Sequence, residues 1–239
     1  MESGTSSRDY PIRDGCVFCR ISSGDEPARY ISPGGVETED RSEVAGDGPL
    51  AFRNRLTWVR VMALVIPQGH PSQEELWSDP GLFAPLLRYA CGIGRELTID
   101  DVPDKVTPEG FRVVSNFGRI AHQSQHHAHV HVIARPDYEP MPVVDVDAPP
   151  HGASSDTVLV EQAQVVSAPW SVRLTLPGAA TQEEMWAHGQ FPGLVGAAVT
   201  LAEDESPEGY RFAADFLPEH GMGPPGFFIL GGGQLDLYA

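Results

Sequence analysis

The sequence contains little cysteine, no long apolar run and few basic residues, and each shortage excludes a class of protein. Three cysteines in 239 residues, Cys16, Cys19 and Cys91, are too few for a disulfide scaffold. No apolar run approaches the roughly 20 residues that span a bilayer, and residues 1–9 are too polar for a signal peptide. We therefore expect a cytoplasmic protein that does not enter a membrane.

Basic residues are scarce and unevenly placed. The 16 Lys and Arg residues face 33 Asp and Glu residues, which gives a formal net charge of −17. A charge this negative argues against nucleic acid as a partner, but a few local donors can still hold a small nucleotide. Residues 151–239 contain 2 basic residues, Arg173 and Arg211, against 11 acidic ones. A small anionic ligand is therefore expected to bind the first 150 residues.

Hydrophobic patterning predicts a strand-rich chain with one main helix. Apolar runs at residues 50–53, 59–66 and 111–115 are typical of strands, the second of them central in a sheet. Ser72 and Glu75 form a capping box that begins a short helix ending near Trp77. Pro80 and Gly81 are expected to separate this short helix from a longer one over residues 83–97. This order of elements predicts the α+β class.

Five of the nine histidines lie between residues 122 and 131. His127, His129 and His131 alternate with Ala128 and Val130, which is the pattern of a half-buried strand. Alternate side chains of a strand share a face, so three imidazoles are expected in a row, about 7 Å apart. A solvated histidine-rich patch or an accidental metal-binding tract does not explain so regular an alternation. Imidazole titrates near neutral pH, which suits nucleophilic and acid–base chemistry on phosphorus.

The second half of the chain repeats the first in weakened form. Residues 181–186 (TQEEMW) echo residues 72–77 (SQEELW), and residues 206–212 (SPEGYRF) echo residues 107–113 (TPEGFRV). The second copy has no Cys-x-x-Cys, has alanine where His70 would fall, and has no histidine in residues 223–233. We therefore expect a disordered leader at residues 1–15, an active domain at 16–136, a linker at 137–157 and a degenerate copy at 158–239.

The first copy resembles the histidine-triad (HIT) family of nucleotide hydrolases and transferases. The triad motif is matched by residues 127–133 (HAHVHVI). Supporting matches are Cys16-x-x-Cys19 leading to residues 24–28 (GDEPA), residues 64–70 (LVIPQGH), Asn116-x-Gly118, and Gln123-Ser124 before the triad. The resemblance implies an antiparallel sheet with helices, in two tandem copies that form an intramolecular pseudo-dimer. A monomer is then expected, with a homodimer as the alternative.

The resemblance also implies roles for individual residues. His129, the middle histidine, would attack the α-phosphorus and form a nucleotidyl-histidine intermediate. His131 would bind the phosphate oxygens. Asn54 stands where many relatives have an acidic residue that holds the ribose hydroxyls. The implied catalytic residues are His129, His131, Ser124 and Gln123, and the implied substrate-binding residues are Asn54, Asn116, Phe52, Gln123, Ser124 and His131.

Zinc-containing relatives bind the metal through two cysteines and two histidines. By resemblance the ligands here would be Cys16, Cys19, His70 and His127. Two thiolates and two imidazoles complete tetrahedral coordination, so the zinc would be structural. The alternative is a pair of free cysteines with His70 and His127 acting as a proton relay, as in zinc-free relatives.

The implied activity is hydrolysis of a nucleoside phosphoramidate, phosphoanhydride or dinucleotide, with release of the nucleoside monophosphate. A histidine at position 131 favours hydrolysis, because transferases of the family commonly have glutamine there. The tandem layout favours instead a nucleotidyltransferase or phosphorylase of the galactose-1-phosphate uridylyltransferase type. A non-catalytic nucleotide sensor and a scaffold recruited to specialised metabolism are further alternatives. No role is assigned to His122 or His126.

Overall fold

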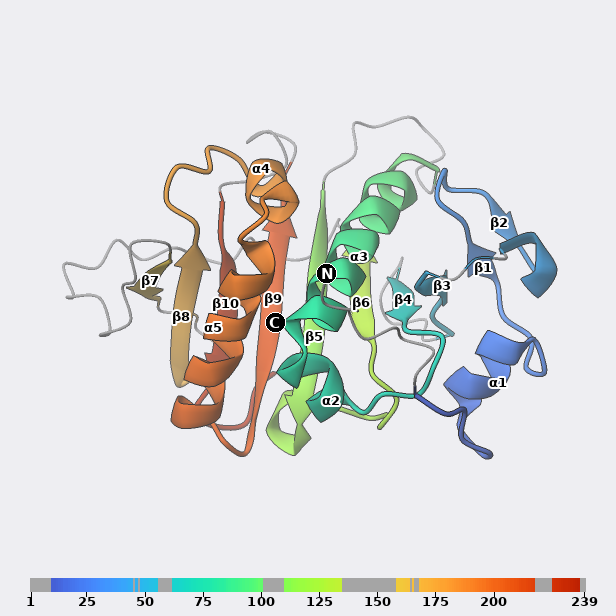
Figure 1. Ribbon diagram of the computed structural model, residues 1–239, viewed down its shortest axis with the longest axis horizontal. Helices are drawn as coiled ribbons and strands as arrows, with labels where there is room; N and C mark the ends of the chain where they lie inside the picture. Colours follow the sequence, from blue (N-terminus) through green and yellow to red (C-terminus); the bar gives the residue numbers. More distant parts are fainter. Residues whose placement is uncertain are drawn as a thin grey trace, which may run out of the picture. The chain divides into compact units, whose positions relative to one another are not determined.

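The computed structural model describes residues 10–44, 46, 48–55, 62–100, 110–134, 158–163, 165, 168–217 and 225–236. The chain divides into two compact units, Met1–Val113 with Gln125–Arg135, and Val114–Ser124 with Pro136–Ala239 (Figure 1). Three predicted segments lie partly or wholly outside the described residues: residues 1–9 of the leader, residues 59–61 of a strand, and the whole linker at 137–157.

The first unit combines helices with a sheet whose described pairings are all antiparallel. Its strands follow the order β2-β1-β3-β4-β6, and β5 begins in this unit. The α+β class predicted from the sequence is confirmed. The elements are α1 (Val17–Ser23), β1 (Tyr30–Ile31), β2 (Glu37–Thr38), η2 (Arg41–Val44), β3 (Leu50–Arg53), β4 (Met62–Ile66), α2 (Gln73–Ser78), α3 (Pro80–Asp100), β5 (Phe111–Gly118), η3 (Arg119–Ala121) and β6 (Val130–Ala134).

Local sequence signals explain where these helices begin. Ser72 and Glu75 form the predicted capping box at the start of α2, with bonds of 3.1 and 2.7 Å. The predicted break between the two helices is present but lies at Asp79, one residue before Pro80, and α3 begins at Pro80 rather than at Phe83. The side chain of Asp79 accepts hydrogen bonds from the backbone of Gly81 and Leu82. Proline suits the first turn of a helix, where its missing N–H would have no partner.

The register of the sheet aligns His131 with an apolar row. Tyr30 pairs with Phe52, Phe52 with Leu64, and Leu64 with His131. Residues directly opposite one another in antiparallel strands point to the same face. The row belongs to a buried cluster that also contains Phe18 of α1. The helix that carries the cysteines therefore packs on the face of the sheet that presents His131.

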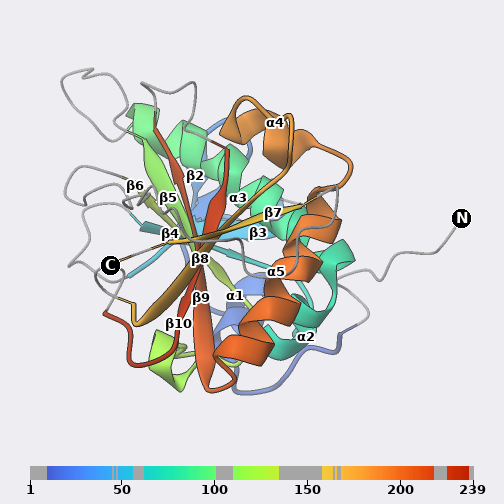
Figure 2. The same ribbon diagram turned by 90° about the vertical axis from the view of Figure 1, so that its left-hand side faces the viewer.

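The second unit repeats the strand order of the first copy. In the first copy the order is β3-β4-β6-β5, and in the second it is β7-β8-β10-β9. Helices α4 and α5 follow β8 as α2 and α3 follow β4, and α5 packs against β8, β9 and β10 (Figures 1 and 2). The predicted tandem repeat is therefore confirmed. Its elements are β7 (Leu159–Gln162), β8 (Trp170–Thr175), α4 (Gln182–Ala187), α5 (Phe191–Glu205), β9 (Gly209–Phe216) and β10 (Phe227–Gly231).

Among the helices within these described ranges, none has both the length and the apolar character needed to cross a membrane.

Close packing between α3 and β5 generates a stability prediction. A Cβ atom added at Gly94 would lie 2.2 Å from a ring atom of Phe111, whereas one added at Gly92 would meet nothing within 4 Å. Gly94→Ala should therefore lower the free energy of unfolding by about 1–3 kcal/mol through overpacking. Gly92→Ala, the matched control in the same helix, should raise it by roughly 0.5–1 kcal/mol because alanine favours the helix. Urea unfolding of both variants measures the difference, and equal effects would contradict the contact.

Candidate functional site

Two cysteines and two histidines converge in the first unit. The potential ligand atoms of Cys16, Cys19, His70 and His127 all lie within 4.8 Å of one another. Cys16 caps α1 and Cys19 lies in its body, His70 follows β4, and His127 precedes β6. The Nδ1 atom of His127 lies 3.5 Å from Sγ of Cys16, and Nδ1 of His70 lies 3.1 Å from Sγ of Cys19. The four predicted ligands thus form one cluster that can hold a metal ion.

Burial favours the uncharged forms of Cys19, His70 and His127. It lowers the pKa of His127 to about 3 and also lowers the pKa of His70. It raises the pKa of the Cys19 thiol. The Nε2 atom of His127 donates a hydrogen bond to the carbonyl oxygen of Pro67 at 3.1 Å, because a carbonyl can only accept. That bond leaves Nδ1 of neutral His127 as the lone-pair nitrogen, directed at the two sulfur atoms.

The alternation predicts that all three triad histidines lie on a strand, but in the structure only His131 does. Strand β6 begins at Val130, so His127 and His129 precede it. His127 forms an isolated bridge with Ser72, and the backbone N–H of Ala128 donates to the carbonyl of Pro71. The loop between β4 and α2 therefore takes the place of a neighbouring strand here, because buried backbone groups need partners.

Gln73 holds the backbone of the middle histidine. Its Oε1 atom accepts a hydrogen bond from the backbone N–H of His129 at 3.0 Å, and its Nε2 donates to the carbonyl of His129 at 3.4 Å. The Gln73 side chain is 1 % exposed. The sequence analysis gave this residue no role, although a signal existed, since glutamine follows the helix cap in both copies, as Gln73 and as Gln182.

The protonation state of His129 follows from its surroundings. Nδ1 of His129 lies 2.9 Å from the carbonyl oxygen of His127, so this nitrogen carries the proton. Burial lowers the pKa of His129, which disfavours the imidazolium form. The ring of Phe18 packs edge-on against it, with the centroids 5.4 Å apart. The lone pair of this neutral imidazole is therefore on Nε2, as a nucleophile requires.

His131 and the predicted sugar-contacting residue share one neighbour. The thioether sulfur of Met62 lies 3.4 Å from Nδ1 of His131 and 2.9 Å from Nδ2 of Asn54. Phe52 is buried beside them in the same row as His131, and its ring packs edge-on against Phe18. The structure thus brings the predicted residues His131, Asn54 and Phe52 together, and Met62 is a neighbour that the sequence analysis missed because methionine has no functional pattern.

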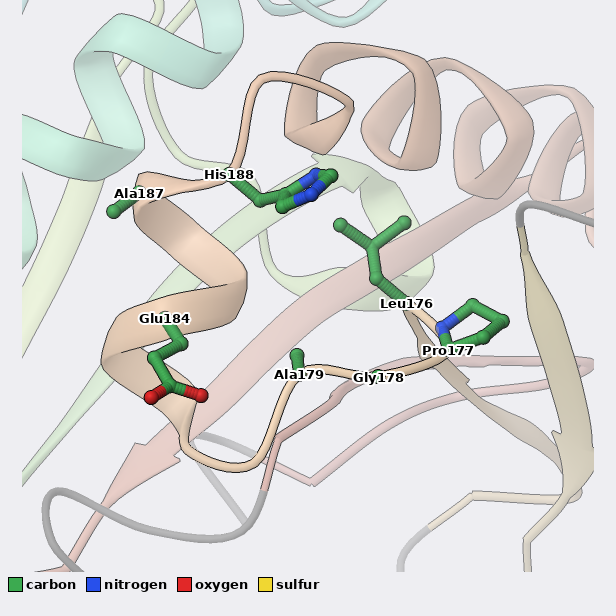
Figure 3. Close-up of a pocket in the computed structure, with 7 residues that line it drawn as sticks. All are labelled: Leu176, Pro177, Gly178, Ala179, Glu184, Ala187 and His188. Carbon is green, nitrogen blue, oxygen red and sulfur yellow. The ribbon is translucent and has the colours of Figure 1, made fainter.

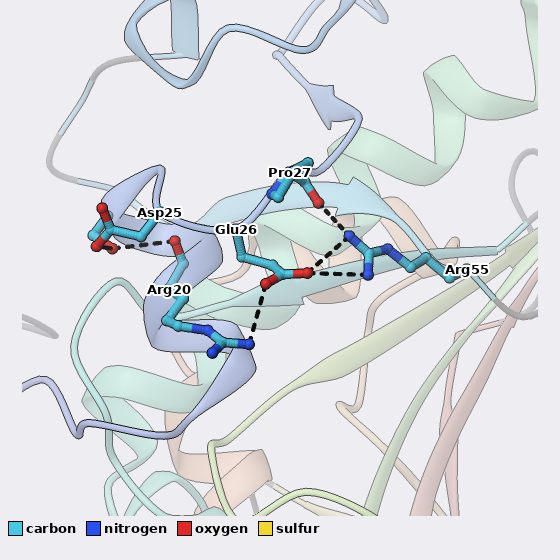
Figure 4. A network of polar contacts seen from close by, with 6 residues as sticks. Arg20, Asp25, Glu26, Pro27 and Arg55 are labelled. Carbon is cyan, nitrogen blue, oxygen red and sulfur yellow. Dashed lines mark hydrogen bonds and ion pairs between the residues drawn. The ribbon is translucent and has the colours of Figure 1, made fainter.

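Arg55, the residue after Asn54, belongs to an ionic network. The carboxylate of Glu26 bonds both Arg20 and Arg55, at 3.1 and 3.2 Å, and Arg55 also donates to the carbonyl of Pro27 (Figure 4). Exposed ion pairs contribute little to stability. The network links the end of β3, where Asn54 lies, to α1 and the turn that follows it.

Three further predicted site residues belong to the second compact unit. Asn116 is 2 % exposed on β5, and the side-chain oxygen of Gln123 accepts a hydrogen bond from the backbone N–H of Gly118 at 2.9 Å. This bond closes the loop between β5 and the triad. Ser124 is exposed in that loop, as are His122 and His126.

The second copy retains the glutamine clamp, meaning the pair of hydrogen bonds from a glutamine side chain to the backbone just before a strand. The residue held there is a glycine, not a histidine. Gln182 bonds the backbone N–H and carbonyl of Gly226, at 2.8 and 2.7 Å, as Gln73 bonds those of His129. Gly226 is therefore the structural equivalent of His129. The second copy also contains a cavity of about 470 Å³, lined by Leu176, Pro177, Gly178, Ala179, Glu184, Ala187 and His188 (Figure 3).

Comparisons with known proteins agree with this arrangement. No family model matches the chain. Over 126 residues the chain is 29% identical to the adenosine 5′-monophosphoramidase of Schizosaccharomyces pombe, covering 52% of this chain and 77% of that protein. Over 120 residues it is 28% identical to an uncharacterized HIT-like protein of Methanocaldococcus jannaschii, covering 50% of this chain and 78% of the relative.

A solved structure resembles nearly the whole chain. A galt-like protein from Arabidopsis thaliana has a TM-score of 0.55 at 14% identity, covering 95% of this chain and 85% of that one. At this identity the likeness concerns the fold, and it extends over both copies. The histidine-triad resemblance that the sequence predicts is thereby confirmed over about half of the chain, and the likeness of fold extends over the degenerate second copy.

Proposed function

We propose that the chain is a HIT-type hydrolase that cleaves a nucleoside 5′-phosphoramidate or a related phosphoanhydride or dinucleotide. The observation that carries the proposal is the buried, neutral His129 whose Nδ1–H donates to the carbonyl of His127. The similarity to an adenosine 5′-monophosphoramidase supports adenylate as the nucleotide and an amine as the leaving group. The predicted phosphoanhydride and dinucleotide substrates share the same α-phosphorus chemistry.

The reaction proceeds through two displacements at phosphorus. The Nε2 lone pair of His129 attacks the α-phosphorus, the bond to the leaving group breaks, and the departing amine or oxygen takes up a proton. A water molecule then attacks the phosphorus, the N–P bond breaks, and neutral His129 and the nucleoside monophosphate are regenerated. Such a path needs a neutral nitrogen nucleophile and hydrogen-bond donors around the phosphoryl oxygens. Those donors would come from His131, Asn116, Gln123 and Ser124, while Asn54 and Phe52 would contact the nucleoside.

Transfer to a phosphate or sugar phosphate is the second candidate. The two-copy fold shared with a galt-like protein favours it. The histidine at position 131 favours water as the acceptor, as argued from the triad sequence. Incubation with a labelled dinucleotide, with and without phosphate or a hexose phosphate, distinguishes the candidates. Product that forms only when the acceptor is present would exclude the hydrolase.

We further propose zinc as the metal of the Cys16, Cys19, His70 and His127 cluster. A tetrahedral zinc site with two sulfur and two nitrogen ligands has ligand atoms about 3.5 Å apart. The sulfur–nitrogen distances of 3.1, 3.5 and 3.6 Å fit that geometry. Two thiols and two imidazoles leave no position for a substrate, so the ion would tie α1 to the histidine segment without taking part in the reaction.

Replacement of His129 tests the nucleophile. His129→Ala should lower kcat/KM for adenosine 5′-phosphoramidate by about a thousandfold or more, because covalent catalysis loses its attacking atom. Rapid quenching of the wild-type enzyme should trap one adenylate on the peptide that contains His129, as read by mass spectrometry. His126→Ala, an exposed imidazole nearby, is the matched control and should keep the activity. An adduct that persists in His129→Ala would refute this assignment.

The glutamine clamp can be tested in both copies with the same substitution. Gln73→Ala removes two hydrogen bonds from the buried backbone of His129, and Gln182→Ala removes two from Gly226. Both variants should lose about 1–3 kcal/mol of unfolding free energy, because buried backbone groups lose their partners. Only Gln73→Ala should also lower kcat, since a displaced His129 attacks poorly. Equal kinetic losses in the two variants would contradict this positioning.

Metal analysis tests the zinc proposal. Cys16→Ser and Cys19→Ser should each reduce bound zinc below one equivalent per chain and lower the melting temperature, since zinc binding contributes to folding. Cys91→Ser, which removes a buried thiol outside the cluster, should keep full zinc content. Elemental analysis of protein purified without chelators provides the measurement. Wild-type protein that lacks zinc after growth and refolding in zinc would refute the proposal.

A further inference from the structure

Arg211 of the second copy is a fully buried cation that the proposed reaction does not use. It is one of the 2 basic residues after position 150, against 11 acidic ones, and its exposure is 0 %. It lies on β9, within the compact unit formed by Val114–Ser124 and Pro136–Ala239. A guanidinium is not buried without strong hydrogen bonds, so its partners indicate what it holds in place.

The described partners of Arg211 include a predicted phosphate-binding residue. Its Nε donates to Oδ1 of Asn116 at 2.7 Å, and its Nη1 donates to the backbone carbonyl of Asp236 at 2.8 Å. Its Nη2 lies 3.5 Å from the carbonyl of Ala121, in the loop that leads to Gln123 and Ser124. One side chain of the degenerate copy thus contacts both β5, where Asn116 lies, and the loop that follows it.

The bond between Arg211 and Asn116 decides which way the Asn116 carboxamide points. Arginine can only donate, so the acceptor that faces it must be the oxygen of the amide. The NH₂ group of Asn116 then points away from Arg211. A phosphate is acceptor-only, so an outward NH₂ attracts it and an outward carbonyl repels it. Without Arg211 the amide could rotate and present either face.

The C-terminal segment of the described chain holds the same loop. The backbone N–H of Leu235 donates to the carbonyl of Ile120 at 3.0 Å, and Nε2 of His122 lies 2.7 Å from the carbonyl of Leu235. His122 adopts a positive φ of 60°, which a non-glycine residue keeps only when its surroundings impose it. Leu235 of the second copy thus holds the loop before Gln123 in place. Leu235 lies far from the triad motif in the sequence.

We infer that Arg211 is a positioning residue that fixes the Asn116 amide as a hydrogen-bond donor for the nucleotide phosphate. The inference rests on the proposed function for its substrate, and it gives the degenerate copy a part in the reaction beyond completing the fold. Arg211 acts through Asn116 and does not itself contact the phosphate.

Arg211→Lys tests the inference in the full-length protein. Lysine keeps the charge but lacks the planar fork, so the bond to Asn116 should be lost. We expect kcat/KM for adenosine 5′-phosphoramidate, and the affinity for AMP measured by calorimetry, to fall about tenfold. Arg173→Lys is the matched control, because Arg173 bonds Glu161 and the carbonyl of Pro225 in the same copy without touching Asn116. Both variants are to be compared at temperatures where each is folded.

A double-mutant cycle separates positioning from general destabilisation. If Arg211 acts through Asn116, Arg211→Lys should have no further effect on kcat/KM or AMP affinity in an Asn116→Ala background. Additive effects, or equal losses in Arg211→Lys and Arg173→Lys, would overturn the inference.

A third measurement does not depend on the proposed function. The NMR signals of the Asn116 side-chain NH₂ group should shift in Arg211→Lys and stay in place in Arg173→Lys, since they report the amide orientation directly. If the wild-type protein neither hydrolyses the phosphoramidate nor binds AMP, the proposed function fails, and this shift alone decides whether Arg211 orients Asn116. Unchanged Asn116 signals in Arg211→Lys would overturn the inference in either case.

Discussion

The candidate site depends on how the buried backbone around His129 finds its hydrogen-bond partners. Strand β6 begins only at Val130, so the preceding peptide groups require other partners. The side chain of Gln73 supplies both, and the loop before it bonds Ala128. The neighbouring backbone also fixes the tautomer of His129, because the carbonyl of His127 accepts a hydrogen bond from its Nδ1–H group. The same few residues therefore supply the hydrogen-bond partners of the buried backbone and set the protonated nitrogen of the His129 ring.

The second copy shows which of these features belong to the fold. Its glutamine, Gln182, holds Gly226 as Gln73 holds His129, so the clamp persists where no imidazole exists. Loss of the histidines and cysteines left the strand order intact. The hydrogen bond from Arg211 to Asn116 is the basis of our proposal that a copy without chemistry can still act, by orienting an amide proposed to bind phosphate.

Burial has different consequences for the proposed metal cluster and for the proposed nucleophile His129. Burial disfavours charge on His127, His129 and the Cys19 thiol. A neutral imidazole is what phosphoryl attack needs at His129. The cysteine pair needs the opposite, since a metal binds thiolate, and a divalent cation would supply the charge that stabilises it. One apolar environment thus serves both sites in different ways.

The sequence by itself determined the fold class, the tandem repeat and the capping box at Ser72, because periodicity, repeats and caps are local or repeated signals. The four members of the metal cluster followed from the resemblance to zinc-containing relatives. The sequence misplaced the helix break at Pro80 and extended the histidine strand too far, since proline suits both a break and a first turn, and alternation does not reveal where a strand's partners begin. Only the tertiary structure decided the protonated nitrogen of His129 and the orientation of Asn116. Both depend on acceptors and donors that the fold brings from distant positions, and no local pattern encodes a contact between residues 116 and 211.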